Sequence, residues 1–408
     1  MATIRPFRAL RPRPEQAAVV AAVPYDVVNR AEAAALAAGN PLSFLHVSRP
    51  EIDLPEGTDP HADLVYDRAA ANFAELRRVA PLLEEIEPSL YLYRLRMGDH
   101  QQVGVAGCFL VDAYEADEIR KHERTRRDKE DDRTRHILAV RAQTGPVFLT
   151  YPASAAVDAV VDRAMAAPPL IDVLADDGVS HAVWRLDPSD RDALVAAFEA
   201  IALLYIADGH HRAASAMRAR ATLRDGSSAP GAPIEADTFL AVAFPDDQVQ
   251  VLPYQRLVRD LAGQTPEAFL AALADRLAVT AGGPLPEGPG KVAMYLAGRW
   301  HALELAAAPA GASAADQLDV ARLQAQVLEP LLGIRDPRTD TRIDFVGGIR
   351  GPAALVERVD SGSAAVAFAL HPVGVADLMS IADGGGIMPP KSTWFEPKLR
   401  DGLLSHLI

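Results

Sequence analysis

The sequence predicts an α/β or α+β protein with mixed sheets. Short apolar runs typical of buried strands, such as Val103–Asp112 and Phe239–Phe244, are interspersed with Ala-rich or charged segments of helical period. The 408 residues are 49% hydrophobic, which provides a sizeable core for two or three domains. We expect three regions: an N-terminal α/β region at 1–100, a central core at 101–230 and a C-terminal α/β region at 231–408.

The first hundred residues predict two helices and a strand. Asn29 is a good N-cap for an Ala-rich helix over 30–38, and Gly39 is placed to end that helix. A longer helical pattern covers His61–Val79, and Leu90–Arg96 alternates as a strand does.

The most charged segment follows the strand Val103–Asp112. Between Glu118 and Arg135, 18 residues include eight Lys or Arg and six Asp or Glu, which is typical of a solvated helix with ion pairs. His122 and Glu123 come just after the strand, however, and enzyme sites lie at such strand ends. We therefore treat these two residues as candidate site residues.

Further elements follow with recognisable boundaries. Two helices in 155–200 flank a strand, and a Ser/Ala/Pro/Gly stretch predicts a mobile loop at Ser227–Pro233. The remaining predicted strands are Val147–Tyr151, His181–Leu186, Phe239–Phe244, the hairpin Lys291–Leu296 with Trp300–Leu305, and Ala364–Leu370. The remaining predicted helices are Pro266–Leu277, Asp316–Leu328 and Val375–Ile381.

The central motif is a strand, a tight turn and a helix. The apolar run Ile201–Ile206 indicates a buried strand, an Asp-Gly turn follows, and helical sequence resumes to about Leu223. This geometry points backbone N–H groups at an anion, and Gly209 lets the backbone approach a ligand closely. Asp208, at the end of the strand, is placed to hold a metal ion or to take a proton.

Three side chains that can carry positive charge begin the helix after this turn. His210, His211 and Arg212 lie in the first helical turn, where cations oppose the helix dipole. Their presence favours a shared anion, most simply phosphate. The alternative is an ordinary polar helix start in which Asp208 serves as the N-cap.

Composition excludes several classes of protein. The net charge of −14 disfavours a role in coating nucleic acid, because that affinity comes mainly from Lys and Arg neutralising phosphates. A single cysteine, Cys108, excludes an internal disulfide framework and is expected to be a buried small hydrophobe. No apolar run reaches membrane-spanning length. These features predict a cytoplasmic protein without a membrane partner.

Lysine is rare and clustered. The chain has 36 Arg and five Lys, and four of the five Lys lie in two short segments, 121–129 and 391–398. Lys is a compact charge that Arg does not freely replace at a phosphate. We expect Lys391 and Ser392, in a Pro-bounded loop leading to Lys398 and a C-terminal helix, to share one phosphate with Arg212. The loop lacks the Gly-x-x-x-x-Gly-Lys-Ser/Thr spacing of a Walker phosphate-binding loop. The alternative to a phosphate site is that this segment is only a structural tail.

Two resemblances add to this reading. The run Asp-Gly-His-His-Arg at 208–212 resembles the phosphate-binding signature of the ParB/sulfiredoxin-like superfamily, which includes kinases of free L-serine. The whole chain is similar to the bacterial family of unknown function numbered 1015. Its hallmarks stand here at Val23–Val28, Asn40–Leu45, Lys121–Thr125, 208–212 and Met388–Thr393.

The resemblance implies a ParB/sulfiredoxin-like core with added N- and C-terminal elements. It also implies a kinase that makes O-phosphoserine from free L-serine with Mg²⁺ and either pyrophosphate or a nucleotide. In the serine kinases of that superfamily the catalytic base is a Glu that follows a His, and Glu123 matches this pattern. The resemblance implies that Asp208 and His210 act with Glu123 in catalysis. His122 and Asp26 are then expected to bind the substrate, with Asp26 facing its ammonium group.

Other readings stay open at this point. A ParB-like module that binds a nucleotide as a regulatory switch fits the same motif, as does a phosphodiesterase or nuclease that uses Asp208 and His210. No Cys/His set has zinc spacing, and no Gly-x-Gly-x-x-Gly follows a strand. The oligomeric state, the phosphoryl donor and the role of Asp344 are not predicted.

Overall fold

The computed structural model describes residues 3–79, 82–225 and 232–408. The chain forms two compact units, Met1–Val249 with Pro397–Ile408 and Gln250–Glu396. These units do not follow the expected boundaries at 100 and 230, because the strands on either side of residue 100 pair with each other. Of the loop expected at Ser227–Pro233, residues 227–231 lie outside the described residues.

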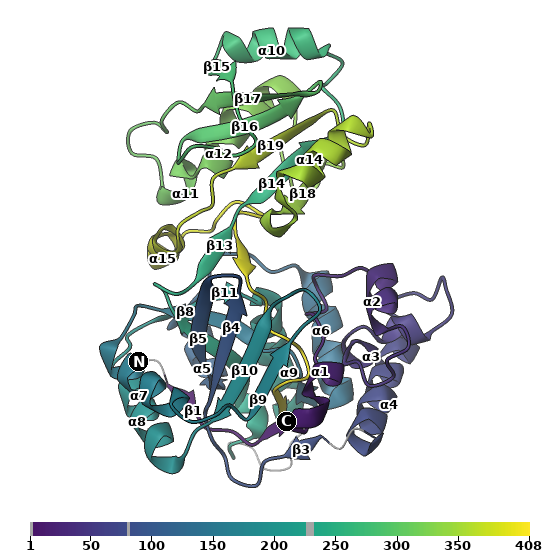
Figure 1. Cartoon of the computed structure of the whole chain (residues 1–408), viewed down its shortest axis with the longest axis vertical. Coiled ribbons are helices and arrows are strands. Elements are labelled where there is room, and N and C mark those ends of the chain that lie inside the picture. The colour runs from purple at the N-terminus through teal and green to yellow at the C-terminus, as the bar shows by residue number, and fades with distance from the viewer. Residues whose placement is uncertain (1–2, 80–81, 226–231) are drawn as a thin grey trace. The chain divides into compact units, whose positions relative to one another are not determined.

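The first unit is built on a nine-stranded sheet (Figure 1). Its order is β6-β11-β8-β12-β5-β4-β10-β9, with β1 paired to β5. β6 is parallel to β11 and β8 is parallel to β12, whereas the other pairs are antiparallel, so the predicted mixed sheet is confirmed. The strands are β1 (Ile4–Arg5), β4 (Tyr91–Met97), β5 (His100–Leu110), β6 (Ile119–Arg120), β8 (Val147–Tyr151), β9 (Ile171–Leu174), β10 (Ser180–Arg185), β11 (Leu204–Asp208) and β12 (Thr238–Pro245).

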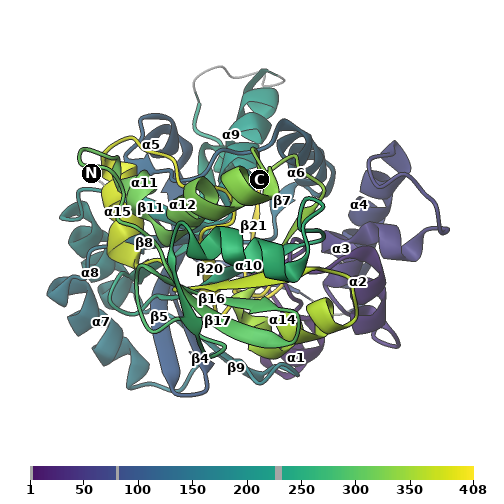
Figure 2. The same cartoon turned by 90° about the horizontal axis from the view of Figure 1, so that it is seen from above.

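Helices pack in two groups around this sheet. Figures 1 and 2 both show α7 beside α8 and α6 beside α9, and α6 also contacts α4. One core lies between the sheet and α7, α8 and α9, and a second joins α2, α3 and α4. The helices are α1 (Ala17–Val20), α2 (Arg30–Ala37), α3 (Leu45–Ser48), α4 (Asp63–Val79), α5 (Val111–Glu115), α6 (Arg127–Val140), α7 (Ala155–Met165), α8 (Pro188–Glu199) and α9 (His210–Asp225).

Local sequence explains most of these elements. The Asn29 side chain accepts a hydrogen bond from the Glu32 N–H at 3.0 Å and the Glu32 carboxylate caps Asn29 in return, which starts α2 as predicted. The charged segment differs from its prediction. Helix α6 begins only at Arg127, because residues 119–120 pair with β11 as the short strand β6.

The end of the chain returns to the first unit as a strand. A small sheet has the order β3-β2-β21-β7, with β2 at Ala9–Arg11, β3 at Leu83–Glu84, β7 at Ala142–Gln143 and β21 at Ser405–Leu407. The helix predicted after Lys398 is therefore wrong. Burial of Leu399, Leu403 and Leu404 holds this segment in an irregular path that helical periodicity could not anticipate.

The second unit carries a six-stranded sheet of order β15-β17-β16-β19-β14-β18 and the pair β13–β20. The predicted hairpin is confirmed, and Ala297 and Gly298 both adopt positive φ at its turn. The helix expected at Asp316–Leu328 is broken into shorter pieces. The strands are β13 (Gln250–Leu252), β14 (Tyr254–Val258), β15 (Ala278–Ala281), β16 (Lys291–Leu296), β17 (Arg299–Glu304), β18 (Ile343–Gly347), β19 (Val366–Leu370) and β20 (Trp394–Glu396); the helices are α10 (Pro266–Ala274), α11 (Ala314–Gln317), α12 (Asp319–Leu323), α13 (Glu329–Leu332), α14 (Gly351–Asp360) and α15 (Val375–Asp383).

Among the helices in the described parts of the chain, none combines the length and apolar character needed to cross a membrane.

Candidate active site

The predicted site residues of the first unit meet at the ends of two parallel strands. Ile119 pairs with Leu204 and Arg120 with Tyr205, so β6 and β11 end at the same edge of the sheet. His122 and Glu123 follow β6, and the Asp-Gly-His-His-Arg run follows β11. Two segments that are 85 residues apart in sequence thus come together where ligands bind in α/β proteins. We call this group the strand-end site; it comprises His122, Glu123, Asp208, His210, Arg212 and Lys398.

The turn from β11 into α9 sets the direction of Asp208. The pairing register with β8 shifts between Ile206 and Asp208, which is a β-bulge of the kind that re-aims side chains beside active sites. The Gly209 carbonyl accepts the Ala213 N–H at 3.0 Å, so Gly209 and not Asp208 occupies the N-cap of α9. The alternative that Asp208 serves as a helix cap is therefore wrong.

Gly209 lets the backbone at this turn lie close to Arg212 and Val147, which a residue with a side chain does not permit. Its φ is +95°, and a Cβ at this position would lie 3.0 Å from the Arg212 Nε and 3.4 Å from the Val147 Cα. Any L side chain here is both strained and crowded. The approach of the Gly209 backbone to a ligand, expected from the sequence, stays a prediction.

Asp208 lies in an ionic cluster. Its Oδ2 accepts a hydrogen bond from the Lys398 Nζ at 2.9 Å, and the Arg212 Nη2 is 3.6 Å from the same oxygen. Burial works to raise the pKa of the Asp208 carboxyl, but the charges of Lys398 and Arg212 hold that pKa well below its usual range. A Mg²⁺ ion at this carboxylate would have to share it with these two cations, and the expected metal role of Asp208 stays a prediction.

Arg212 is the most enclosed cation of the site. Its side chain is 10% exposed, its Nη2 is 3.8 Å from the Asp26 Oδ2, and its Nη1 donates to the Pro146 carbonyl. Burial works to lower the pKa of Arg212, but the nearby Asp26 and Asp208 carboxylates raise it above its usual value. Within the described parts of the chain, the buried Nε has no hydrogen-bond partner. The predicted proximity of Asp26 to the motif is thus found, with its carboxylate directed toward Arg212.

Two imidazoles pack against each other beside this cluster. The rings of His122 and His210 are T-shaped at 4.4 Å, and the His122 backbone N–H donates to the His210 Nε2 at 3.5 Å. Burial lowers the pKa of His122 to about 4 and that of His210 well below its usual value, so both are neutral at neutral pH. His211 differs from both, because its Nε2 accepts the Arg126 N–H at 3.0 Å.

Sequence reasoning missed a small cavity behind the motif, in which charged groups meet a mostly apolar lining. The cavity has a volume of about 40 Å³, enough for one water molecule, and its lining includes Tyr25, Arg133, Thr144, Arg212 and Asp401. Burial raises the pKa of the Asp401 carboxyl to about 7, although Arg212 works to lower it. No local pattern marks Asp401 or Arg133. The only signal available was the enrichment of charge near Lys398 and in the segment after Glu118.

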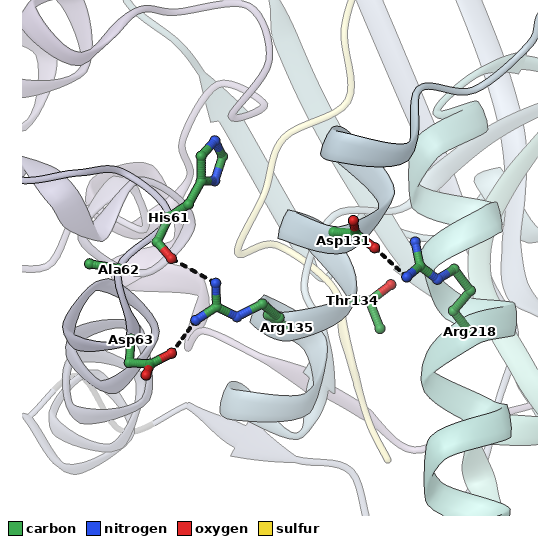
Figure 3. Close-up of a pocket in the computed structure, with 7 residues that line it drawn as sticks. All are labelled: His61, Ala62, Asp63, Asp131, Thr134, Arg135 and Arg218. Carbon is green, nitrogen blue, oxygen red and sulfur yellow. Dashed lines mark hydrogen bonds and ion pairs between the residues drawn. The ribbon is translucent and has the colours of Figure 1, made fainter.

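A larger pocket lies elsewhere in the first unit, between α4, α6 and α9 (Figure 3). We call it the helix pocket; its volume is about 620 Å³ and it is lined by His61, Ala62, Asp63, Asp131, Thr134, Arg135 and Arg218. Arg135 donates to the His61 carbonyl at 2.6 Å and to Asp63, and Arg218 donates to Asp131. None of the predicted site residues lines this pocket.

Lys391 and Ser392 belong to the second unit. The Lys391 Nζ donates to the Tyr254 hydroxyl at 3.3 Å and lies 5.1 Å from the centre of that ring, while the Ser392 hydroxyl donates to the Pro389 carbonyl at 2.6 Å. Asp344 forms an ion pair with Arg358 at 3.0 Å. The expectation that Lys391 and Ser392 share a phosphate with Arg212 stays a prediction.

The fold and the site define a mixed α/β protein whose polar residues converge at the ends of two parallel strands. The family model described as "Protein of unknown function (DUF1015)" matches residues 4–321, and the chain belongs to this family. None of the curated proteins matches the chain.

Several solved structures are similar to parts of the chain. SbnI with a C-terminal truncation, from Staphylococcus aureus, matches at 13% identity over 74% of this chain and 87% of that chain, with a TM-score of 0.39. A mutant free serine kinase in complex with AMP matches at 13% identity over 74% and 92%, with a TM-score of 0.35. A conserved hypothetical protein from Pyrococcus furiosus matches at 14% identity over 74% and 95%, with a TM-score of 0.33.

Proposed function

We propose that this protein is a small-molecule kinase with a ParB/sulfiredoxin-like core that phosphorylates the hydroxyl of free L-serine. The observation that carries the proposal is the convergence of Glu123, Asp208, Arg212 and Lys398 at the ends of β6 and β11. Phosphoryl transfer is catalysed mainly by positioning and by charge, and it needs a phosphate cradle, cations and a base. The choice of serine rests on the resemblance of the 208–212 motif to that of free-serine kinases.

The donor phosphate is assigned to the start of α9. The N-terminal backbone N–H groups of this 16-residue helix offer hydrogen bonds to an anion, and Gly209 permits the close approach. Lys398 and Arg212 stand beside the turn and supply positive charge for the transferring group. Asp208 orients both cations through its carboxylate, and it keeps its charge because its pKa is lowered.

Glu123 is assigned as the residue that faces the acceptor hydroxyl of serine. This residue is exposed at the end of β6 while its neighbour His122 is buried, so its carboxylate is accessible to a small substrate. A carboxylate in this position acts as general base toward the serine hydroxyl. Asp26, 38% exposed beside Arg212, is available for the ammonium group of the amino acid.

Mg²⁺ is expected to arrive with the donor, because Mg²⁺ in such sites is held largely by phosphate oxygens and water. When bound, it neutralises charge on the phosphates. The donor is pyrophosphate or a nucleotide, and the site residues named above serve either of them.

A donor-by-acceptor screen tests this function. The purified chain is incubated with pyrophosphate, ATP or ADP, each with Mg²⁺ and a mixture of free amino acids, and products are identified by mass. We expect O-phosphoserine with one donor, and none in an Asp208→Asn control. An unchanged nucleotide that nevertheless binds would support a regulatory module instead, and cleavage of phosphodiesters without phosphoserine would support a nuclease or phosphodiesterase.

A further inference from the structure

Three metal-ligating side chains lie together in the strand-end site. His122, Glu123 and His210 each offer one ligand atom, and these atoms all lie within 4.8 Å of one another. Two imidazole nitrogens and a carboxylate oxygen around one tetrahedral ion, at bond lengths of about 2.0–2.2 Å, are about 3.3 Å apart. The three groups therefore need to close by at most about 1.5 Å to share one ion.

One ring nitrogen of His122 is buried without a hydrogen-bond partner. The residue is 2% exposed, and its Nδ1 has no such partner among the described residues. A buried imidazole nitrogen without a partner is able to bind a metal ion, and histidine is the commonest metal ligand in proteins.

His210 and Glu123 complete the set from two different segments. The His210 Nε2 accepts the His122 N–H at 3.5 Å, which is a long and weak hydrogen bond that a metal could displace. His210 is buried whereas Glu123 is exposed, so the carboxylate can adjust its position without disturbing the core. The parallel pairing of β6 and β11 holds the two segments together before any ion binds.

We infer that His122, Glu123 and His210 form a binding site for a divalent transition metal such as Zn²⁺ or Co²⁺. Two imidazoles select borderline metals over Mg²⁺, which prefers an all-oxygen shell. Asp208 is not part of this set, because its Oδ2 is engaged by Lys398. Three protein ligands leave an open coordination position, next to the proposed phosphate cradle. The site does not depend on the proposed function, and an ion held by Glu123 would occupy the carboxylate proposed there as the general base.

Metal binding is measured on the full-length chain, freed of any affinity tag and stripped with a chelator. Titration with Co²⁺ is followed by its visible absorption, and Zn²⁺ is then added in competition. We expect one Co²⁺ per chain, displaced by Zn²⁺ and not by a large excess of Mg²⁺. Glu123→Gln, at an exposed position that leaves the fold intact, should weaken Co²⁺ binding by at least about tenfold, as should His122→Gln.

His211→Gln is the matched control, because His211 is adjacent in sequence but its Nε2 is occupied by the Arg126 N–H. It should bind Co²⁺ as the unmodified chain does. Each variant is first shown to be folded by circular dichroism in the presence of chelator. The inference is overturned if the unmodified chain takes up no stoichiometric Co²⁺ or Zn²⁺, or if Glu123→Gln binds as tightly as the unmodified chain. No phosphoryl donor or serine is present, so either result leaves the proposed kinase activity to be judged separately.

Discussion

The strand-end site and the helix pocket contain the same kinds of residue, namely Asp, His and Arg, but they use them differently. In the helix pocket, Arg135 is 39% exposed and Arg218 is 31% exposed, and each is paired with a carboxylate that is more exposed than the arginine itself (Figure 3). In the strand-end site, Arg212 is 10% exposed and Lys398 is 15% exposed, and their shared partner Asp208 ends a buried strand.

This difference separates a solvated surface from a site able to do chemistry. Exposed ion pairs are screened by water and contribute little, whereas charges in a partly dry environment act strongly on one another and shift pKa values. The larger volume belongs to the helix pocket, whereas the buried histidines with lowered pKa and the carboxylate shared by two cations belong to the strand-end site. Chemical environment rather than volume therefore identifies the better candidate, and five variants test this distinction.

The largest effect is expected for Asp208→Asn. Asn keeps an oxygen for Lys398 but removes the charge that orients Lys398 and Arg212, and loss of one positioning carboxylate can cost about 10⁴-fold in rate. Phosphoserine formation should fall below detection while circular dichroism remains that of the folded chain. Near-normal turnover would return Asp208 to a structural role and remove the main distinction between the two regions.

Glu123→Gln should lower kcat by about 10²- to 10⁴-fold with little change in KM, because the variant cannot accept the serine proton. Steady-state kinetics with the donor found in the screen measure both constants. The matched control is Asp128→Asn, an exposed carboxylate of the neighbouring segment that pairs with Arg126, which should leave kcat unchanged. A loss confined to KM would make Glu123 a binding residue.

Asp401→Asn should change how stability depends on pH. The folded-state pKa of Asp401 is raised to about 7, above its unfolded value, so its contribution to stability is complete in acid and is lost as pH rises to about 7. Removing the ionisable group should stabilise the protein above pH 7, by an upper limit of about 4 kcal/mol, and make the stability curve flatter between pH 4 and pH 7. Chemical denaturation across that range measures the difference, and parallel curves for the two proteins would show that Asp401 is not held in a low-dielectric cavity.

Lys398→Met should destabilise the first unit by about 2–3 kcal/mol, because it leaves the Asp208 carboxylate partly buried without its nearest cation. Denaturant titration of this variant and of Lys398→Arg, which keeps the charge, separates loss of charge from loss of packing. Equal stability in the two variants would indicate that the Asp208–Lys398 pair is no stronger than the exposed pairs of the helix pocket.

The smallest effect is expected for Arg218→Ala in the helix pocket. Its ion pair with Asp131 is open to solvent and its pair with Glu130 is partly buried, and pairs open to solvent are worth about 0.2–1 kcal/mol. Thermal unfolding should shift little, and phosphoserine formation should be unchanged. A large loss of activity would mean that the helix pocket, and not the strand-end site, binds the substrate.

Most regular elements could be predicted from sequence, because their signals are local. The Asn29 capping box, the hairpin turn at Ala297-Gly298 and the apolar strand Val147–Tyr151 each depend on a few adjacent residues. The Asp-Gly-His-His-Arg turn is also local, since a positive φ at Gly209 and the start of α9 follow from neighbouring residues. The mixed α/β class follows from the sum of these signals.

Tertiary structure alone decided which residues share the site. Strand β6 is only two residues long and carries no periodic signal, yet its pairing with β11 brings His122 and Glu123 to the motif. The irregular segment after Pro397 delivers Lys398 to Asp208 and Asp401 to the buried cavity because its leucines are buried in the first unit. Sequence determines local backbone preference and chemical type at each position. Contacts between distant segments depend on burial and strand pairing across the whole fold, which no local pattern records.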